Sequence, residues 1–322
     1  MDNMKMTDHT TTNWTTFLGF DVGKDTIAIF DSASGQHHIL ENRAAPLRRF
    51  LKTCDPQSYA VCEATGGYEG CLLDCLLACN ITCHRADARK VKSFIRSFGT
   101  LAKTDAIDAR ALADYGRERH ARLAVWQARS TAQVELQTLA HHRVDLVKLR
   151  AAEKCRLQAP QAKIIRPFCR KLIAHLDKQI ATIEREINRR IASDERLART
   201  VECLLAMPGV GQITAHTLCA FLPELGTLTR RQVAALAGLA PHPRDSGKMH
   251  GYRRTHGGRP QIRTALFMAA MSARQHDQQM RAFYQRLIKN GKKPIVAITA
   301  IMRKMIVILN ARMRDMEMLH QS

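Results

Sequence analysis

A strand, a turn and a second strand at the start of the chain constrain its fold most strongly. Residues 16–22 (TFLGFDV) and 26–30 (TIAIF) are apolar runs separated by a turn that contains Gly23 and Asp25. Such a pattern predicts a β-hairpin. We expect further strands at 37–40, 59–62 and 81–84, and helices at 45–53, before residue 78 and from about 105 onward. This alternation predicts an α/β domain with a mixed sheet.

Long helices replace this alternation between about residues 130 and 200. Apolar residues recur there at heptad-like spacing, at Leu172, Leu176, Ile180, Ile183, Ile187 and Ile191. A coiled-coil hairpin or dimerisation arm is the simplest interpretation, and two ordinary amphipathic helices are the alternative. The chain beyond residue 200 is predicted to be mainly helical, without strong strands. We therefore expect domains at 14–125, 126–200 and 201–315.

The charge of the chain points to a polyanionic partner. Its 322 residues include 50 Lys and Arg against 29 Asp and Glu, a formal charge of +21. Nucleic acid is the usual partner of a protein this basic. The hydrophobic share of 45% excludes wholesale disorder. An aromatic share of only 5% argues against base stacking as the main binding device.

Membrane insertion and secretion are not expected. No segment approaches 18 uninterrupted apolar residues, and residues 1–13 are polar and lack an apolar signal core. A cytoplasmic location is therefore predicted. The chain has 10 cysteines, which we expect to be reduced thiols. Cys71, Cys75 and Cys79 share one helical face among leucines, which favours core packing over a metal cluster.

Four acidic residues are candidate ligands of a divalent cation. Asp21 and Glu63 each end an expected strand, and Asp105 and Asp108 lie three apart at the start of an expected helix. Carboxylates that converge repel one another unless a cation lies between them, and hard oxygen ligands suit Mg²⁺ or Mn²⁺. Each residue taken singly could instead form a turn or cap a helix, and Asp25 is an alternative to Asp21.

A glycine-containing turn between two expected helices resembles a helix-hairpin-helix. Residues 204–222 read LLAMPGVGQITAHTLCAFL, with the turn at Pro208, Gly209, Val210 and Gly211. Glycines there would let backbone amides meet a phosphate at the start of the next helix. We therefore predict that Gly209 and Gly211 contact nucleic acid.

A basic loop contains a candidate nucleophile. Residues 236–263 carry one acid, Asp245, beside many cations and Ser246. The neighbouring charges would lower the cost of forming a serine alkoxide, although serines in glycine-rich loops commonly form turns. His242, His250 and His256 are possible acid–base groups or phosphate contacts, and their spacing does not predict zinc. The predicted nucleic-acid contacts of this loop are Arg244, Lys248, Arg253, Arg254 and Arg259.

The motifs together resemble a known family. FLGFDVGKDT, VCEATGGYEG and KTDAIDARALADYG are similar to the RNase H/RuvC-like DEDD domain of insertion sequence 110 family transposases. AMPGVGQITAHTLCAFLPELG and VAALAGLAPHPRDSGKMHGYRRTHGGRPQIRTAL are similar to their C-terminal transposase domain. The resemblance runs in the same order from about residue 16 to residue 310.

The resemblance implies a mechanism that the composition does not show. Asp21, Glu63, Asp105 and Asp108 would bind Mg²⁺ or Mn²⁺, and Ser246 would attack DNA and form a covalent phosphoserine link. It also implies an element-encoded RNA that pairs with element and target DNA, homodimers or homotetramers, and association with the nucleoid. Two alternatives remain open: a RuvC-like nuclease or junction resolvase without a covalent serine intermediate, and a non-enzymatic architectural nucleic-acid-binding protein.

Overall fold

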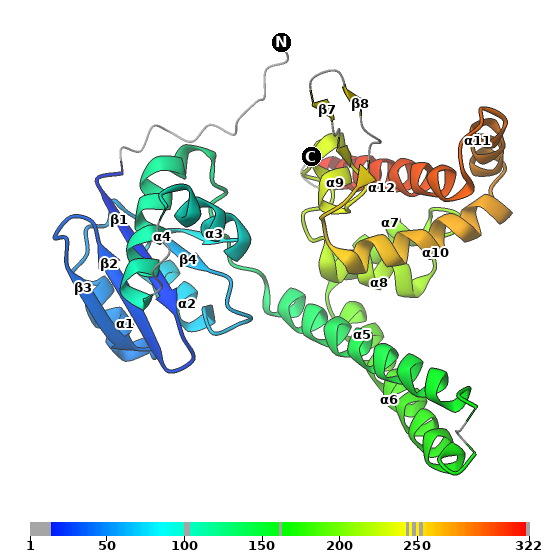
Figure 1. Cartoon of the computed structure of the whole chain (residues 1–322), viewed down its shortest axis with the longest axis horizontal. Helices are drawn as coiled ribbons and strands as arrows, with labels where there is room; N and C mark the ends of the chain where they lie inside the picture. Colours follow the sequence, from blue (N-terminus) through cyan, green and yellow to red (C-terminus); the bar gives the residue numbers. More distant parts are fainter. Residues whose placement is uncertain are drawn as a thin grey trace. The chain divides into compact units, whose positions relative to one another are not determined.

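The computed structural model describes residues 14–99, 104–160, 163–242 and 254–319, together with the backbone of 245–246 and 249–250. The chain forms two compact units, residues 1–128 and 129–322 (Figure 1). The division lies close to the boundary predicted near residue 125, whereas the boundary predicted near residue 200 lies inside the second unit.

The first unit is built on a five-stranded sheet with the order β3-β2-β1-β4-β5. The strands are β1 (Thr16–Val22), β2 (Thr26–Asp31), β3 (His37–Glu41), β4 (Ser58–Glu63) and β5 (Thr82–Ala86). β1, β2 and β3 pair antiparallel, and β4 and β5 extend the sheet in parallel on the other side of β1. The predicted mixed α/β sheet is therefore confirmed.

Helices cover both faces of this sheet (Figure 1). α1 (Ala44–Leu51) and α2 (Gly70–Ala78) pack on one face, against side chains such as Leu18 and Phe20. α3 (Ala88–Ser97) and α4 (Asp105–Arg119) pack on the other, against Phe17, Tyr59 and Val61. A short 3₁₀ turn, η1 (His120–Arg122), follows. Because strand side chains alternate between faces, odd-numbered residues of β1 and β4 face α4.

One helix of this layer was not predicted from the sequence. α3 begins after Asp87, whose side chain accepts a hydrogen bond from the backbone N–H of Arg89, and it buries Val91 and Phe94. An aspartate cap followed by apolar residues at helical spacing is a recognisable helix start. The lysines and arginines between them obscured that pattern.

α4 lies unusually close to β1. A Cβ atom at Gly19 would stand 1.9 Å from the carbonyl oxygen of Ala109 and 2.6 Å from the backbone nitrogen of Ala113. One turn later, a Cβ atom at Gly116 would stand 2.8 Å from a methyl of Val61. Only glycine allows backbone-to-backbone contact of this kind, so α4 is seated directly on the central strand.

The second unit begins with a helical hairpin, α5 (Thr131–Leu157) and α6 (Arg166–Ala192). The predicted apolar stripe of α6 is largely covered within the chain. Ile187 and Ile191 join the main core of this unit, and Leu176 and Ile180 form a smaller cluster with Leu146 of α5. This burial accounts for the stripe without a second chain, and an oligomeric role for the hairpin stays a prediction.

The remaining helices form the main core of the second unit. They are α7 (Glu195–Leu205), α8 (Gln212–Phe221), α9 (Arg230–Leu236), α10 (Pro260–His276), α11 (Gln278–Lys289) and α12 (Pro294–Leu319). α12 is long and apolar enough to cross a membrane by length and composition. It is nevertheless a core helix here, because Ile301, Met305 and Leu309 are fully buried among its neighbours.

Short strands interrupt these helices, where the sequence predicted no strong strand. β6 (Pro241–His242) pairs with β9 (Arg254–Thr255), and β7 (Asp245–Ser246) pairs with β8 (Met249–His250). Strands of two residues are too short to show the alternation that reveals a strand in a sequence. The helical character predicted for the region is otherwise confirmed.

Candidate active site

Two of the four predicted carboxylates stand on neighbouring strands. β1 and β4 are parallel, and their register pairs Phe20 with Cys62. The next position along each strand is Asp21 and Glu63. Both have odd numbers, so both side chains leave the sheet on the face that α4 covers. The fold therefore brings these two residues together from positions 42 apart in the sequence.

The other two carboxylates arrive on the first turn of α4. Gly116 packs near Phe17 at the start of β1, and Ala109 packs on Gly19 further along the strand. α4 therefore runs opposite to β1, and its first turn lies toward the strand end that carries Asp21. Asp108 is half-buried and Asp105 is exposed.

Capping does not explain Asp105. The cap of α4 is Thr104, whose hydroxyl accepts a hydrogen bond of 3.3 Å from the backbone N–H of Ile107. Asp105 is the first residue inside the helix, where a carboxylate gains only the modest benefit of the helix dipole. The alternative offered by the sequence, that Asp105 caps its helix, is therefore wrong.

The four carboxylates suit a divalent cation in donor type and in backbone position. Their oxygens are the ligands that Mg²⁺ and Mn²⁺ prefer, and three segments deliver them to one edge of the sheet. Within the described ranges, however, no three His, Cys, Asp or Glu side chains lie close enough together to hold a metal ion. The backbone thus places the set, and its side chains are not gathered into a finished site.

Only the backbone position of Ser246 is described. It lies on β7, opposite Met249, within the connection from β6 to β9. At the base of that connection, the rings of His242 and His256 stack with centroids 4.2 Å apart. The side chain of Ser246 and the predicted nucleic-acid contacts Arg244, Lys248 and Arg253 fall outside the described residues, as do the side chain of His250 and the loop around it.

The two glycines of the predicted helix-hairpin-helix differ in surroundings. Gly209 has φ +88°, and a Cβ atom there would stand 2.6 Å from the carbonyl oxygen of Ala269 and 2.7 Å from the nitrogen of Ala273 on α10. Gly211 caps α8, and a Cβ atom there would meet nothing within 4 Å. Gly209 thus serves helix packing, while Gly211 leaves the start of α8 open.

Two predicted nucleic-acid contacts at the C-terminal end of the basic loop also differ. Arg254 on β9 is exposed. Arg259 instead donates two hydrogen bonds of 2.7 Å to the carboxylate of Glu224 and one of 2.7 Å to the carbonyl of Phe221. Arg259 therefore has a structural role, and its predicted contact with nucleic acid stays a prediction.

Two family models match the chain, in the order of its two units. A transposase model for the DEDD domain of IS110 elements matches residues 18–162, and a model described as transposase IS116/IS110/IS902 family matches residues 201–285. The first covers the strands and helix that carry all four carboxylates, and the second covers the serine loop. The chain belongs to the IS110 family of transposases.

Relatives of this transposase resemble it over different lengths. The pilin gene-inverting protein of Moraxella bovis is 26% identical over 319 residues, covering 93% of this chain and 96% of the relative. The transposase for element IS1328 of Yersinia enterocolitica is 25% identical, covering 72% and 75%. An uncharacterised 42 kDa protein of element IS900 from Mycobacterium paratuberculosis is 31% identical, covering 46% and 39%.

The turn after Glu63 in this transposase has an anchor that the sequence reading did not identify. The buried carboxylate of Glu69 accepts hydrogen bonds from the backbone N–H and the hydroxyl of Thr65 and from the N–H of Gly67, at 2.8–3.1 Å. Its other oxygen accepts from the guanidinium of Arg85 on β5. Burial alone would raise the pKa of Glu69, but these hydrogen bonds outweigh it and lower that pKa to about 2.

This anchor ties the segment that follows the candidate ligand to the edge strand of the sheet. Glu69 has 3% of its side chain exposed, and Arg85 has 37%. The signal in the sequence was a glutamate two residues after Gly67, within the VCEATGGYEG motif. Gly66 and Gly67 both have positive φ, 80° and 122°, which favours glycine at these positions, and Glu69 supplies the acceptor for the N–H of Gly67.

Proposed function

We propose that this transposase cuts and rejoins DNA strands with Asp21, Glu63, Asp105 and Asp108 as ligands of a divalent cation and Ser246 as the nucleophile. One observation carries the proposal: the parallel pairing of β1 with β4 sets Asp21 beside Glu63 on the face that receives the first turn of α4. The sheet, three antiparallel strands continued by two parallel ones, also supports a RuvC-like fold for the first unit.

The chemistry assigned to Ser246 is a balanced exchange of esters. Its hydroxyl oxygen attacks the phosphorus of the scissile phosphodiester, a bond from serine oxygen to phosphorus forms, and one bond from phosphorus to a DNA oxygen breaks. The serine proton passes to a base, and the departing DNA oxygen takes up a proton from an acid or from water and leaves as a hydroxyl end. A hydroxyl of the new partner strand then attacks the phosphoserine and releases Ser246, so no external energy source is required.

The residues around these groups have supporting roles. Cations of the serine loop lower the cost of the alkoxide and hold the phosphate. A bound divalent cation would polarise the phosphate and stabilise the departing oxygen. The four carboxylates would hold that cation, and the anchored turn at Glu69 limits the freedom of Glu63.

The partners follow from the same proposal. We infer that the substrate is DNA at the element ends and at the target, and that an element-encoded RNA acts as guide. The protein would act in the cytoplasm, at the nucleoid. A homodimer or homotetramer would allow the carboxylates of one chain to act with the serine of another. Light scattering of the purified chain, alone and with DNA, tests that assembly.

An excision assay tests the mechanism. We expect Asp105→Ala and Ser246→Ala to reduce excision at least a thousandfold, on the order of the loss of a nucleophile or metal ligand. Asp114→Ala is the matched control on α4, because Asp114 pairs with Arg117 away from the sheet edge. A covalent protein–DNA adduct should form with the wild type and be absent with Ser246→Ala.

Two results would replace this proposal. If Ser246→Ala still cleaves DNA and the adduct never forms, while Asp105→Ala is inactive, the chain is a metal-dependent nuclease or junction resolvase. If Asp21→Asn and Glu63→Gln leave every activity unchanged, the chain is an architectural binding protein whose affinity falls steeply with salt.

A further inference from the structure

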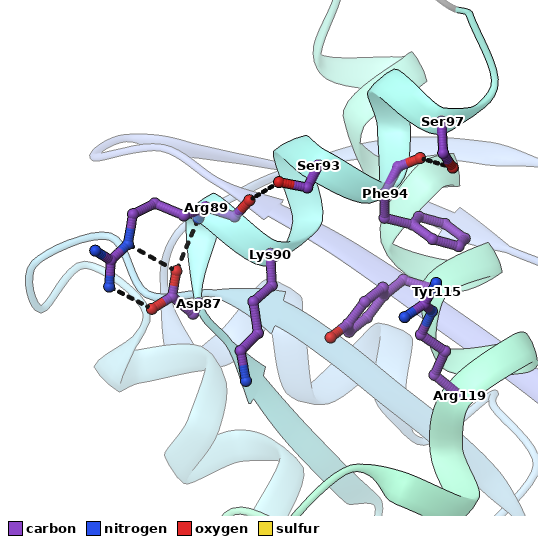
Figure 2. Close-up of a pocket in the computed structure, with 8 residues that line it drawn as sticks. All are labelled: Asp87, Arg89, Lys90, Ser93, Phe94, Ser97, Tyr115 and Arg119. Atoms are coloured by element: carbon purple, nitrogen blue, oxygen red, sulfur yellow. Dashed lines mark hydrogen bonds and ion pairs between the residues drawn. The ribbon is translucent and has the colours of Figure 1, made fainter. Parts of the chain in front are cut away.

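A pocket of about 500 Å³ lies between α3 and α4, on the first unit. Its walls combine cations, hydroxyls and aromatic rings, and include Asp87, Arg89, Lys90, Phe94, Tyr115 and Arg119. Figure 2 shows the side chain of Lys90 and the hydroxyl end of Tyr115 extending into the same open space. None of these residues belongs to the predicted catalytic set.

Aromatic rings are concentrated here in a chain that has few of them. Phe94 packs edge-on against Tyr115, with centroids 5.2 Å apart, and against Phe98, with centroids 4.9 Å apart. Phe94 and Tyr115 are buried. Phe98 is not part of the pocket lining but is 60% exposed and adjoins the lining residue Phe94. A phenylalanine this exposed presents a ring face on which a planar ligand can stack.

The charge of the pocket is positive. The guanidinium of Arg119 lies over the rings of Phe94 and Tyr115, at 5.2 and 5.8 Å from their centroids. Asp87, the acid of the lining, already pairs with Arg89 at 3.1 Å (Figure 2). Lys90 and Arg119 are therefore available to an anionic ligand, and both are exposed.

We propose that this pocket binds one nucleotide of a single-stranded nucleic acid. Lys90 and Arg119 hold the phosphate, and the base stacks on Phe98. Cations that follow a backbone, combined with aromatic faces, are the usual device for holding single strands. The volume lies within the range of pockets that enclose small ligands, about 300–1,000 Å³. The proposal rests on the proposed function only in that the ligand is a nucleic acid.

The position of Arg119 on α4 sets the length of strand that could join the pocket to the candidate carboxylates. Arg119 ends the helix that Asp105 begins, and a helix of 15 residues rises about 21 Å. A strand held in the pocket and stacked as in a duplex, at about 3.4 Å per nucleotide, spans this distance with on the order of six nucleotides. The pocket is a holding site, separate from the place of strand cleavage.

Binding of labelled oligonucleotides to the full chain tests the proposal. Labelled poly(dT) and poly(rU) of twenty nucleotides are titrated with the protein, and binding is followed by fluorescence anisotropy. EDTA in the buffer prevents metal-dependent strand cleavage, so the result does not depend on whether the proposed catalytic mechanism is correct. We expect Phe98→Ala to raise Kd about tenfold and Phe98→Trp to stay close to wild type. Lys90→Gln should lower the slope of log Kd against log salt by about one.

Matched controls separate the pocket from general charge and from exposed rings. Lys92→Gln removes an exposed cation from α3 that does not line the pocket. Phe168→Ala removes a ring that is 71% exposed on the second unit. Both should change Kd less than twofold. Circular dichroism and thermal unfolding of each variant confirm that Phe98→Ala is folded.

A second measurement locates the strand directly. Oligonucleotides with 4-thiouridine or 4-thiothymidine are crosslinked by light, and the attached tryptic peptide is identified. We expect the peptide 97–103, which contains Phe98. Loss of the RNA crosslink alone in Phe98→Ala identifies RNA as the ligand, and loss of the DNA crosslink alone identifies DNA.

Three results would overturn the proposal. In the first, Phe98→Ala and Lys90→Gln bind both oligonucleotides as the controls do. In the second, the crosslinked peptides all lie outside 87–119. In the third, free UMP competes as well as the oligonucleotide at equal nucleotide concentration, which would make the pocket a site for small molecules.

Discussion

The carboxylates of the first unit and the serine of the second are supported by very different amounts of backbone. Asp21 lies on a strand of seven residues with hydrogen-bonded neighbours on both sides, and Glu63 ends a strand paired on both sides. Ser246 lies on a strand of two residues that pairs with one other strand of two residues. The backbone hydrogen bonds alone therefore support the carboxylates much better than they support Ser246.

The difference suggests a division of labour. The sheet fixes the spacing of the carboxylates through its register and through the contact of α4 with Gly19. The serine loop has little sheet of its own, so we expect DNA to contribute to placing Ser246. Substitutions on either side of this comparison test it.

The largest effect is expected from Gly19→Ala. Its new Cβ atom would stand 1.9 Å from the carbonyl oxygen of Ala109. This oxygen belongs to the backbone of α4, which cannot move away as the end of a flexible side chain can. We expect a loss of about 3 kcal/mol or more in the free energy of unfolding, measured by denaturant titration. Excision should fall as well, since α4 carries Asp105 and Asp108.

Gly70→Ala is the control for this change. Gly70 is the first residue of α2, and a Cβ atom there would meet nothing within 4 Å. Its stability should stay within about 1 kcal/mol of wild type. If Gly19→Ala is equally mild, α4 does not rest on β1 as described, and the placement of its carboxylates has no support.

The second prediction separates the two glycines of the turn between α7 and α8. Gly209→Ala combines a positive φ with close contacts to α10, so we expect a loss of about 2–3 kcal/mol. Gly211→Ala should cost less than about 1 kcal/mol. If the start of α8 meets phosphate, Gly211→Ala should weaken DNA binding at unchanged fold, measured by anisotropy. Equal stability of the two variants would contradict the packing of Gly209 against Ala269 and Ala273.

The sheet could be predicted because its strands are long enough to show a pattern. Residues 16–31 display apolar runs around a turn, and the acids at strand ends followed from where those runs stop. Parallel pairing of β1 with β4 could not be read from the sequence, because it depends on contacts between segments about 40 residues apart. The meeting of Asp21 with Glu63 was therefore a hypothesis from acids at the ends of expected strands, which the family resemblance strengthened, and the register supplies the backbone positions that support it.

Other features were missed for different reasons. α3 was missed because basic residues fill its exposed face, although Asp87, Val91 and Phe94 have helical spacing. The two-residue strands around Ser246 have no periodicity. The contact of Gly209 with α10 involves residues 60 positions away, so the glycine was assigned to phosphate binding on local grounds.

The third prediction tests the anchor behind Glu63. Glu69→Gln removes the charge that pairs with Arg85, and we expect a loss of about 2 kcal/mol at neutral pH. Because the pKa of Glu69 is lowered to about 2, its contribution is complete above the ordinary value near 4.5 and is lost as pH falls from there toward 2. The wild type should lose stability in that window, and Glu69→Gln should lose less.

Glu41→Gln is the matched control for this pair. Glu41 pairs with Arg43 at the surface, with 63% and 79% of the side chains exposed, so its removal should cost less than about 0.5 kcal/mol. If the two glutamine variants unfold alike, the Glu69 cluster does not hold the turn.

The smallest effect concerns Arg259, where a role in the fold competes with the predicted role in nucleic-acid binding. Burial would raise the pKa of Glu224, but the hydrogen bonds from Arg259 lower it overall. Both side chains remain about a third exposed, at 32% and 35%. We therefore expect Arg259→Gln and Glu224→Gln each to cost only about 1 kcal/mol, and the double variant to cost less than their sum.

The salt dependence of DNA binding decides between the two roles. If Arg259 serves the fold, its glutamine variant keeps the wild-type slope of log Kd against log salt, whereas Arg254→Gln on exposed β9 lowers that slope by about one. If Arg259→Gln lowers the slope and Glu224→Gln does not weaken binding, the guanidinium leaves its ion pair for a phosphate. Glu224 would then compete with DNA for Arg259, and DNA binding would rearrange part of the second unit. Such a rearrangement agrees with the expectation that DNA helps to place Ser246, whereas the sheet of the first unit holds the carboxylates without DNA.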